Sequence, residues 1–293
     1  MLRALLLSAA LLAGLPVFAA DPFTSDPEPD TMFPPAIEEL TFTSGANRLT
    51  GLLYQANGLG PHPTVVLLHG LPGNEKNLDL AQVARRAGFN VMFFHYSGAW
   101  GSEGDYTLLG LPGDVAAALD FLRSNATRYR VDAGRLSLLG HSMGGWAALA
   151  AGKQDAGVAC VGALAPANLG LMAEGIRAGE PGATAFIDYA DTLFMLRNFD
   201  GASMRADLLS KPAMQLDTRL FGPGLRGKSV LMVTGANDVV LPPESMFNPV
   251  VAAYRRDPAI SLKAETIPGD HSFSYSRIQL TRLVLDWLQA DCR

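Results

Sequence analysis

One serine stands among three glycines in residues 139–145 (LGHSMGG), where an apolar run ends. Gly140 to Gly144 fit the pattern G-x-S-x-G, in which a sharp turn between a strand and a helix exposes a serine hydroxyl. A side chain at either glycine would collide with neighbouring elements, so glycine is a condition of the turn. Since a strand-like run precedes Ser142 and an alanine-rich, helix-like stretch follows it, we predict that Ser142 is a nucleophile rather than part of a plain turn.

A serine hydroxyl is a poor nucleophile unless a base removes its proton, and the base needs an acid to orient it. His271 is the best candidate base among the five histidines, because it follows a strand-like run and precedes the final helical stretch. The alternative is that His271 is a solvated loop histidine. His141 adjoins the serine in sequence, which makes its geometry unsuitable. The other histidines are predicted to end strands or to lie in a loop: His69, His95 and His62.

Asp238 is the candidate acid. It follows the strand-like residues 229–234, so it falls at the carboxyl end of a strand, where ligands bind in parallel sheets. Asp270 is the rival, but a residue adjacent to the histidine rarely reaches the far ring nitrogen. We therefore predict a catalytic triad of Ser142, Asp238 and His271.

Acyl chemistry also requires N–H donors for the oxyanion of the tetrahedral intermediate. The backbone N–H of Met143, directly after the serine, is one predicted donor. The other is the N–H of Leu71, because residues 68–73 (LHGLPG) follow an early strand and Gly70 lets the chain turn inward. The alternative for this segment is an ordinary turn at the end of a strand.

The elements that must position these residues alternate along the chain from residue 37. The 293 residues, 48% of them hydrophobic, suffice for one sizeable core. Strand-like runs cover residues 37–43, 48–54, 64–69, 90–96, 136–140, 158–165, 229–234 and 262–267. Helix-like stretches cover residues 78–87, 114–122, 146–151, 245–254 and 278–288. Apart from an antiparallel pair at the start, this alternation favours an α/β fold with a mainly parallel sheet flanked by helices.

From about residue 37 to its end, the chain resembles the α/β-hydrolase superfamily, and within it the prolyl-oligopeptidase-like and serine-aminopeptidase-like serine hydrolases. The resemblance rests on residues 68–73, 95–98 with 101–104, 140–145, Asp238 and His271. It implies the α/β-hydrolase fold and the chain order serine, aspartate, histidine. The family's usual arginine after the tyrosine is replaced by Ser97, so no function is carried onto that residue. The chain differs from the dienelactone hydrolases, whose nucleophile is a cysteine at the position of Ser142.

The alternation of strands and helices stops at about residues 168–226, where the resemblance places a helical lid. Six large apolar side chains lie there amid short helical patterns: Phe186, Tyr189, Phe194, Met195, Phe199 and Met204. Either they form an apolar cap that shapes an acyl or aromatic pocket, or they only pack the cap onto the sheet.

The first residues have the composition of an export signal. Arg3 precedes an apolar run over residues 4–15, and residues 17–19 (VFA) resemble a cleavage site. The run is shorter than the roughly 20 residues that span a bilayer, so we predict a cleaved signal peptide at residues 1–19, with an uncleaved anchor as the alternative. A proline-rich, poorly structured leader at 20–36 and a hydrolase domain at 37–293 follow. The protein is then expected in the periplasm or outside the cell, without stable membrane insertion.

Two cysteines, Cys160 and Cys292, permit one disulfide in an exported chain. The predicted topology puts both at the end of the sheet opposite to the active site; the alternative is a buried thiol and a free cysteine in the tail. No cluster has metal-ligand spacing and no phosphate-binding loop occurs, so neither a metal nor a cofactor is predicted. The net charge of −5 and the lack of a dense basic run disfavour nucleic acid as a partner.

These patterns together predict an exported serine hydrolase that cleaves small carboxylic esters through an acyl-enzyme. A serine peptidase acting on short peptides is the alternative, since the sequence does not distinguish esters from amides. A catalytically silent binding protein with a hydrolase fold is disfavoured, because all three triad residue types and both donor loops are present.

Overall fold

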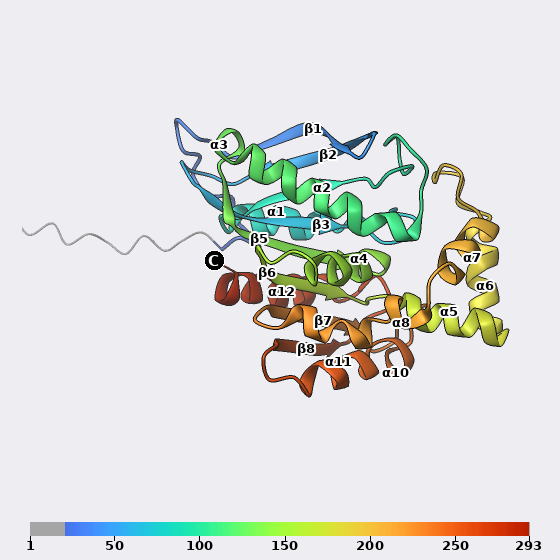
Figure 1. Ribbon diagram of the computed structural model, residues 1–293. Coiled ribbons are helices and arrows are strands. Elements are labelled where there is room, and N and C mark those ends of the chain that lie inside the picture. The colour runs from blue at the N-terminus through green and yellow to red at the C-terminus, as the bar shows by residue number, and fades with distance from the viewer. Residues whose placement is uncertain (1–20, 293) are drawn as a thin grey trace, which may run out of the picture.

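The computed structural model describes residues 21–292, so the predicted signal peptide lies outside the described residues. Eight strands form one sheet in the order β1-β2-β4-β3-β5-β6-β7-β8 (Figure 1). Their bounds are β1 (Ala36–Ser44), β2 (Asn47–Gln55), β3 (His62–Leu68), β4 (Asn90–Phe94), β5 (Val131–His141), β6 (Val158–Leu164), β7 (Ser229–Gly235) and β8 (Ser261–Ile267). Each predicted strand is therefore present.

The sheet is mainly parallel, as predicted. β1 pairs antiparallel with β2, β2 pairs antiparallel with β4, and the other pairings are parallel. β3 and β4 are buried along their whole length, which explains why they are continuous apolar runs in the sequence. Two details of the prediction are wrong: His62 begins β3 instead of lying in a loop, and β5 begins at Val131 rather than at residue 136.

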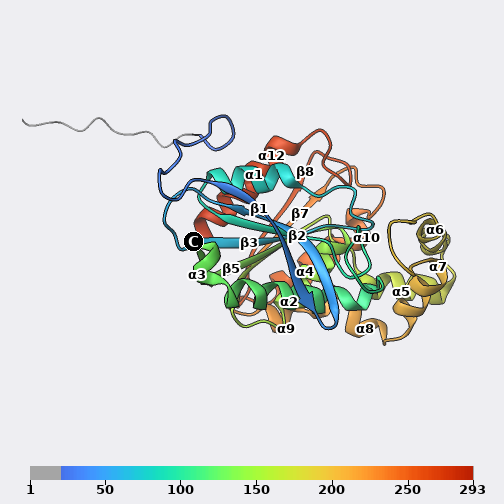
Figure 2. The same cartoon turned by 90° about the horizontal axis from the view of Figure 1, so that it is seen from above.

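Helices cover both faces of the sheet, and Figure 2 shows α1 and α12 on the opposite side from α2. Because side chains alternate along a strand, Val65 and Leu67 of β3 enter the core beneath α1 and α12, whereas Val66 and Leu68 enter the core beneath α2 and α4. These helices are α1 (Leu78–Arg86), α2 (Leu111–Ser124), α4 (Met143–Gly152) and α12 (Arg277–Asp291), and two short turns are η1 (Leu108–Gly110) and α3 (Ala126–Tyr129).

The helix predicted over residues 245–254 is two helices, α10 (Pro243–Met246) and α11 (Asn248–Arg255). They are divided at Phe247, and Pro249 lies in the first turn of the second helix. Proline has no N–H to donate inside a helix but fits its first turn, so the chain starts a new helix there. Within residues 21–292, none of the helices is long and apolar enough to cross a membrane.

Residues 168–226, here called the cap segment, follow the carboxyl end of β6 and form short helices, of which the first three lie to one side of the sheet (Figure 1). These are α5 (Leu169–Ala178), α6 (Pro181–Ala190), α7 (Gly201–Leu209), α8 (Ala213–Leu216), η2 (Thr218–Leu220) and α9 (Gly222–Leu225). Of the apolar side chains noted there, Phe199 and Met204 are buried, while Phe194 is 93% exposed. Packing therefore accounts for the apolar side chains of Phe199 and Met204. That the cap segment acts as a lid stays a prediction.

Backbone hydrogen bonds join the cap segment to the loop that follows β4. The N–H of Arg197 donates to the carbonyl oxygen of Gly98 over 2.7 Å, and the N–H of Trp100 donates to Met195 over 3.3 Å. Ala99 and Leu196 form an isolated antiparallel bridge between the same two loops. The cap segment is thus bound to the body of the protein in its middle as well as through its own two ends.

The leader forms no helix or strand over residues 21–35, and side chains of the body contact it; its poorly structured character stays a prediction. The guanidinium of Arg86 donates a 2.5 Å hydrogen bond to the carbonyl oxygen of Pro22. The guanidinium of Arg282 stacks on the ring of Phe23, 4.5 Å from its centroid. Pro22 and Phe23 lie in a turn closed by hydrogen bonds from the N–H groups of Thr24 and Ser25 to the carbonyl oxygen of Asp21. Arginines from α1 and α12 therefore contact a segment that has no helix or strand of its own.

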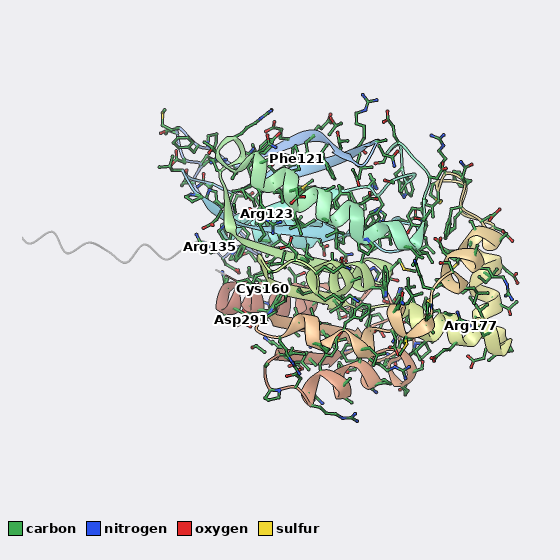
Figure 3. The ribbon with its side chains drawn as sticks, in the orientation of Figure 1. Phe121, Arg123, Arg135, Cys160, Arg177 and Asp291 are labelled. Carbon is green, nitrogen blue, oxygen red and sulfur yellow. A yellow bond between two sulfur atoms is a disulfide. The ribbon has the colours of Figure 1, made fainter. Side chains whose placement is uncertain are left out.

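The predicted disulfide is confirmed, and its position agrees with the predicted topology. Cys160 lies near the amino end of β6, Cys292 follows α12, and their α-carbons are 5.9 Å apart. Figure 3 places Cys160 and Asp291 together at the end of the sheet away from Arg177 of the cap segment. The disulfide therefore ties the end of α12 to the sheet.

Removing this disulfide should destabilise the fold. It joins residues 132 apart in the sequence, and the loop-entropy account assigns such a cross-link about 4–5 kcal/mol of unfolding free energy. We expect Cys160→Ser, Cys292→Ser and the double variant to lose similar amounts in urea unfolding, because any of them removes the same bond. Two free thiols per chain in the denatured, unreduced wild-type protein would contradict the bond.

Candidate active site

Ser142 lies on the turn between β5 and α4, as the sequence pattern predicts. β5 ends at His141 and α4 begins at Met143. The backbone of Ser142 has φ 56° and ψ −119°, a conformation that residues other than glycine rarely adopt. Its N–H donates to the carbonyl oxygen of Leu164 on β6 over 2.8 Å, so the neighbouring strand holds this strained residue in place.

Close backbone contacts explain both glycines of the motif. A Cβ atom at Gly140 would lie 2.0 Å from the carbonyl oxygen of Gly144, and one at Gly144 would lie 2.4 Å from that of Leu68. No real Cβ occupies such a position, so a side chain at either residue would push α4 away from β5 or β3. The glycines therefore allow the helix to start close enough to the sheet for the turn to form.

The three predicted triad residues come together from three different strands. Asp238 follows β7, and its Oδ2 lies 2.7 Å from Nδ1 of His271. Nε2 of His271, in the loop after β8, lies 2.9 Å from Oγ of Ser142. The Asp238 side chain is fully buried and that of His271 is 16% exposed. The buried carboxylate thus orients an imidazole whose other nitrogen contacts the serine hydroxyl.

Backbone donors hold the second carboxylate oxygen of Asp238. The N–H groups of Val240 and Leu241 donate to Oδ1 over 2.9 and 2.8 Å. A carboxylate accepts only, so Nδ1 of His271 donates to Asp238, and in the neutral ring Nε2 is left to accept the serine proton. This arrangement can remove a proton from Ser142 as its oxygen attacks a carbonyl carbon.

Asp270, the rival carboxylate, has other partners. Its Oδ1 accepts the N–H of Ser274 over 2.8 Å, and this backbone hydrogen bond is the largest cause that lowers the pKa of Asp270. The carboxylate therefore shapes the loop that carries His271, while Asp238 contacts the ring itself.

Both predicted oxyanion donors lie beside the serine in sequence or in space. Met143 is the first residue of α4, where the N–H groups have no partner within the helix. A Cβ added to Gly70 would lie 2.9 Å from Cβ of Ser142, so the loop that carries Leu71 adjoins the serine. Gly70 O lies 2.7 Å from Nδ1 of His69, and the Gly70–Leu71 peptide is trans, so the N–H of Leu71 points away from that ring. The role of both donors stays a prediction.

Side-chain hydrogen bonds to backbone carbonyl oxygens hold residues 69–73, one from His69 within the loop and two from residues after β4. His69 is fully buried and bonds Gly70, and the indole N–H of Trp100 donates to the carbonyl oxygen of Pro72 over 2.7 Å. Tyr96 donates its hydroxyl to the carbonyl oxygen of His69 over 3.4 Å. The sequence predicts no role for these side chains, although His69 and Tyr96 belong to the motifs on which the family resemblance rests.

His141 makes a second contact that the sequence does not predict. Its Nε2 lies 2.8 Å from the backbone carbonyl oxygen of His271, so this nitrogen bonds the loop of His271 and not the hydroxyl of Ser142. Among residues 21–292, no group of three or more histidine, cysteine or acidic side chains could hold a metal ion.

Residues 65–286 match the sequence profile described as the alpha/beta hydrolase family. The chain therefore belongs to the α/β-hydrolase family, which agrees with the resemblance read from its motifs. The mainly parallel sheet with helices on both faces is the fold of that family. Among curated proteins, none matches this sequence.

Solved structures with the same fold include esterases and a peptidase. Est1E from Butyrivibrio proteoclasticus with bound ferulic acid is 18% identical, with a TM-score of 0.67 over 86% of this chain and 98% of that one. The Pyrococcus furiosus esterase Pf2001 is 16% identical, with a TM-score of 0.61 over 89% and 94%. The Pyrococcus horikoshii acylaminoacyl peptidase is 15% identical, with a TM-score of 0.68 over 88% of this chain but 42% of that one. At these identities the likeness concerns the fold alone.

Buried histidines around the site should make the fold sensitive to acid. Burial lowers the pKa of both His69 and His141 from an ordinary 6.5 to about 4. The unfolded chain therefore binds more protons below pH 6.5, and the unfolding free energy falls as the pH drops from 7 to 4, by about 2 kcal/mol per histidine at pH 5. Urea unfolding at several pH values measures this loss.

The variant His141→Gln isolates the contribution of one ring. It removes one titrating group, so its unfolding free energy should fall less steeply between pH 7 and pH 4 than that of the wild type. Equal slopes for the two proteins would show that His141 does not titrate differently in the folded and unfolded states.

Proposed function

We propose that this protein is an exported serine hydrolase that cleaves carboxylic esters through an acyl-enzyme. The observation that carries the proposal is the continuous contact from Asp238 through His271 to Ser142, over 2.7 and 2.9 Å. Membership of the α/β-hydrolase family supports the same reaction class. The disulfide supports export, because disulfides persist in oxidising compartments.

In the proposed reaction, Oγ of Ser142 attacks the ester carbonyl carbon while Nε2 of His271 takes its proton. Asp238 stabilises the resulting imidazolium and keeps Nδ1 protonated. The N–H groups of Met143 and Leu71 bind the oxyanion of the tetrahedral intermediate. His271 then gives its proton to the leaving alkoxide, which departs as the alcohol. A water oxygen then attacks the acyl carbon while Nε2 of His271 takes its proton. The bond from the acyl carbon to Oγ of Ser142 breaks, Oγ takes that proton back from His271, and the acid is released.

Exposed apolar side chains lie on the segments that carry or adjoin the triad. Val239, directly after Asp238, is 87% exposed, and Tyr275, in the loop of His271, is 61% exposed. Trp100 and Phe194 are 37% and 93% exposed on the two loops that join the cap segment to the body. Exposed apolar groups around a site favour apolar ligands, so we infer that the substrate carries an aliphatic or aromatic acyl group and that the cap segment acts as the lid over it.

A fluorophosphonate probe tests the nucleophile without knowledge of the substrate. The wild-type protein should be labelled, and Ser142→Ala should not be, because it lacks the attacking oxygen. Ser137→Ala is the matched control: Ser137 is a buried serine of the same strand and should leave labelling unchanged. Labelling of folded Ser142→Ala would rule out Ser142 as the nucleophile.

A panel of p-nitrophenyl esters with acyl chains of increasing length, beside aminoacyl nitroanilides, tests the substrate class. We expect hydrolysis of the esters and little of the anilides. The opposite preference would make the protein a peptidase, and a folded protein that neither reacts with the probe nor cleaves any substrate would be a binding protein.

The two carboxylates near His271 should differ in their effect on catalysis. Asp238→Asn should lower kcat by roughly 10⁴-fold, because an amide no longer fixes the tautomer that leaves Nε2 free to accept a proton. Asp270→Asn is the control, since that carboxylate bonds the backbone of its own loop, and it should lower kcat far less. A larger loss from Asp270→Asn than from Asp238→Asn would show that Asp270, and not Asp238, orients His271.

A further inference from the structure

A second histidine lies against the proposed base, and it takes no part in the proposed transfer of protons. His141 ends β5 directly before Ser142 and is 4% exposed. Its Nε2 is 2.8 Å from the backbone carbonyl oxygen of His271, and the centroids of the two rings are 4.9 Å apart. His141 therefore contacts the base through the backbone of the base, not through its reacting nitrogen.

The partners of its two nitrogens determine the tautomer of His141. A carbonyl oxygen only accepts hydrogen bonds, so Nε2 of His141 carries a proton and its N–H donates a hydrogen bond to the backbone carbonyl oxygen of His271. Burial keeps the pKa of His141 low, at about 4, so the ring is neutral near pH 7 and its Nδ1 has no proton. His141 thus offers the loop of the base a hydrogen bond without placing a second positive charge beside the imidazolium that forms on His271.

Burial of the other nitrogen of His141 costs free energy, and the hydrogen bond from Nε2 has to offset that cost. Nδ1 is buried and has no hydrogen-bond partner within residues 21–292. It faces the loop of Gly70, where a Cβ atom would lie 3.5 Å from it. An unpartnered buried acceptor costs free energy that an apolar side chain would not, so the bond from Nε2 is the specific contribution of a histidine at this position.

This hydrogen bond connects two parts of the sheet that are not neighbours. His141 ends β5, whereas the loop of His271 follows β8, and β6 and β7 lie between these strands. The next carbonyl oxygen of the loop, that of Ser272, accepts a hydrogen bond from Arg277 over 3.1 Å. Since Arg277 belongs to α12, His141 makes the direct link between the backbone of the base and the strand that carries the nucleophile.

We propose that His141 is a positioning residue, which holds the backbone of His271 so that its Nε2 stays within hydrogen-bond distance of Oγ of Ser142. The proposal rests on the proposed serine-hydrolase function, because it assigns His141 a part in the same reaction. His141 does not touch the reacting atoms. Its loss should therefore change the rate of the chemical step and leave substrate binding unchanged.

Two amide variants separate the hydrogen bond from the mere presence of a polar side chain. The amide nitrogen of His141→Gln can take the place of Nε2 and donate to the carbonyl oxygen of His271, while the shorter side chain of His141→Asn cannot reach it. We expect fluorophosphonate labelling and kcat of His141→Gln to stay near the wild-type values. Those of His141→Asn should fall roughly 10- to 100-fold with KM unchanged, the scale expected when a catalytic group is misplaced.

His62 supplies the matched control. It is also buried, and its Nε2 lies 3.1 Å from the carbonyl oxygen of Gly58, at the opposite end of β3 from the site. His62→Gln and His62→Asn should change thermal stability without changing the labelling rate. If His141→Asn does not fold, His141→Leu serves as a second variant without the donor, in an interior that accepts an apolar side chain.

The outcomes distinguish this proposal from the proposed function. Wild-type protein that no probe labels would overturn the serine-hydrolase function itself, and with it the role of His141. Wild-type protein that is labelled, together with equal rates for folded His141→Gln and His141→Asn, would overturn only the positioning role. Restored rate in the glutamine variant and reduced rate in the asparagine variant would support it.

Discussion

The turn at Ser142 exists because two backbone segments approach each other where no side chain fits. Gly140 and Gly144 each lack the Cβ atom that would fall within 2.0 or 2.4 Å of a neighbouring carbonyl oxygen. Their contact lets α4 begin directly against β5 and β3, and it leaves Ser142 in a strained conformation of a kind that costs about 1–3 kcal/mol. The sheet offsets that strain, so the direction of the serine side chain is set by its neighbours.

Around this turn, neutral histidines hold backbone carbonyl groups. His69 bonds the carbonyl of Gly70 in the predicted oxyanion loop, and His141 bonds that of His271. Burial lowers the pKa of both rings, so near neutral pH each bond orients a peptide group without adding a charge. Both rings therefore contribute hydrogen bonds to the backbone around Ser142 rather than charge.

Helix α12 connects the site to the far end of the sheet. It begins directly after the loop of His271, and Arg277 in its first turn pairs with Asp79 at the start of α1. Its last residues lead to Cys292, which is bonded to Cys160. The helix that follows His271 is thus held at both ends, although only one end lies near the predicted triad.

The motifs of the sequence were sufficient to predict the strand order along the chain, the parallel character of the sheet and the grouping of Ser142, Asp238 and His271. These follow from local rules: glycine where backbones meet, apolar runs in buried strands, and polar residues at the carboxyl ends of those strands. The disulfide could be predicted for the same reason, because a helix that starts at one end of a sheet must finish at the other.

Only the tertiary structure decided which groups contact the backbone around the site. The bonds from His141 to His271 and from Trp100 to Pro72 join residues that are 130 and 28 positions apart, and no sequence spacing encodes them. The leader, too, is bound by arginines of α1 and α12 that lie far from it in the chain. A side-chain hydrogen bond to a backbone carbonyl places no demand on the residue type that carries the carbonyl. The residue that carries the accepting carbonyl therefore gives no sign of such a contact in the sequence. Only the folded structure shows it.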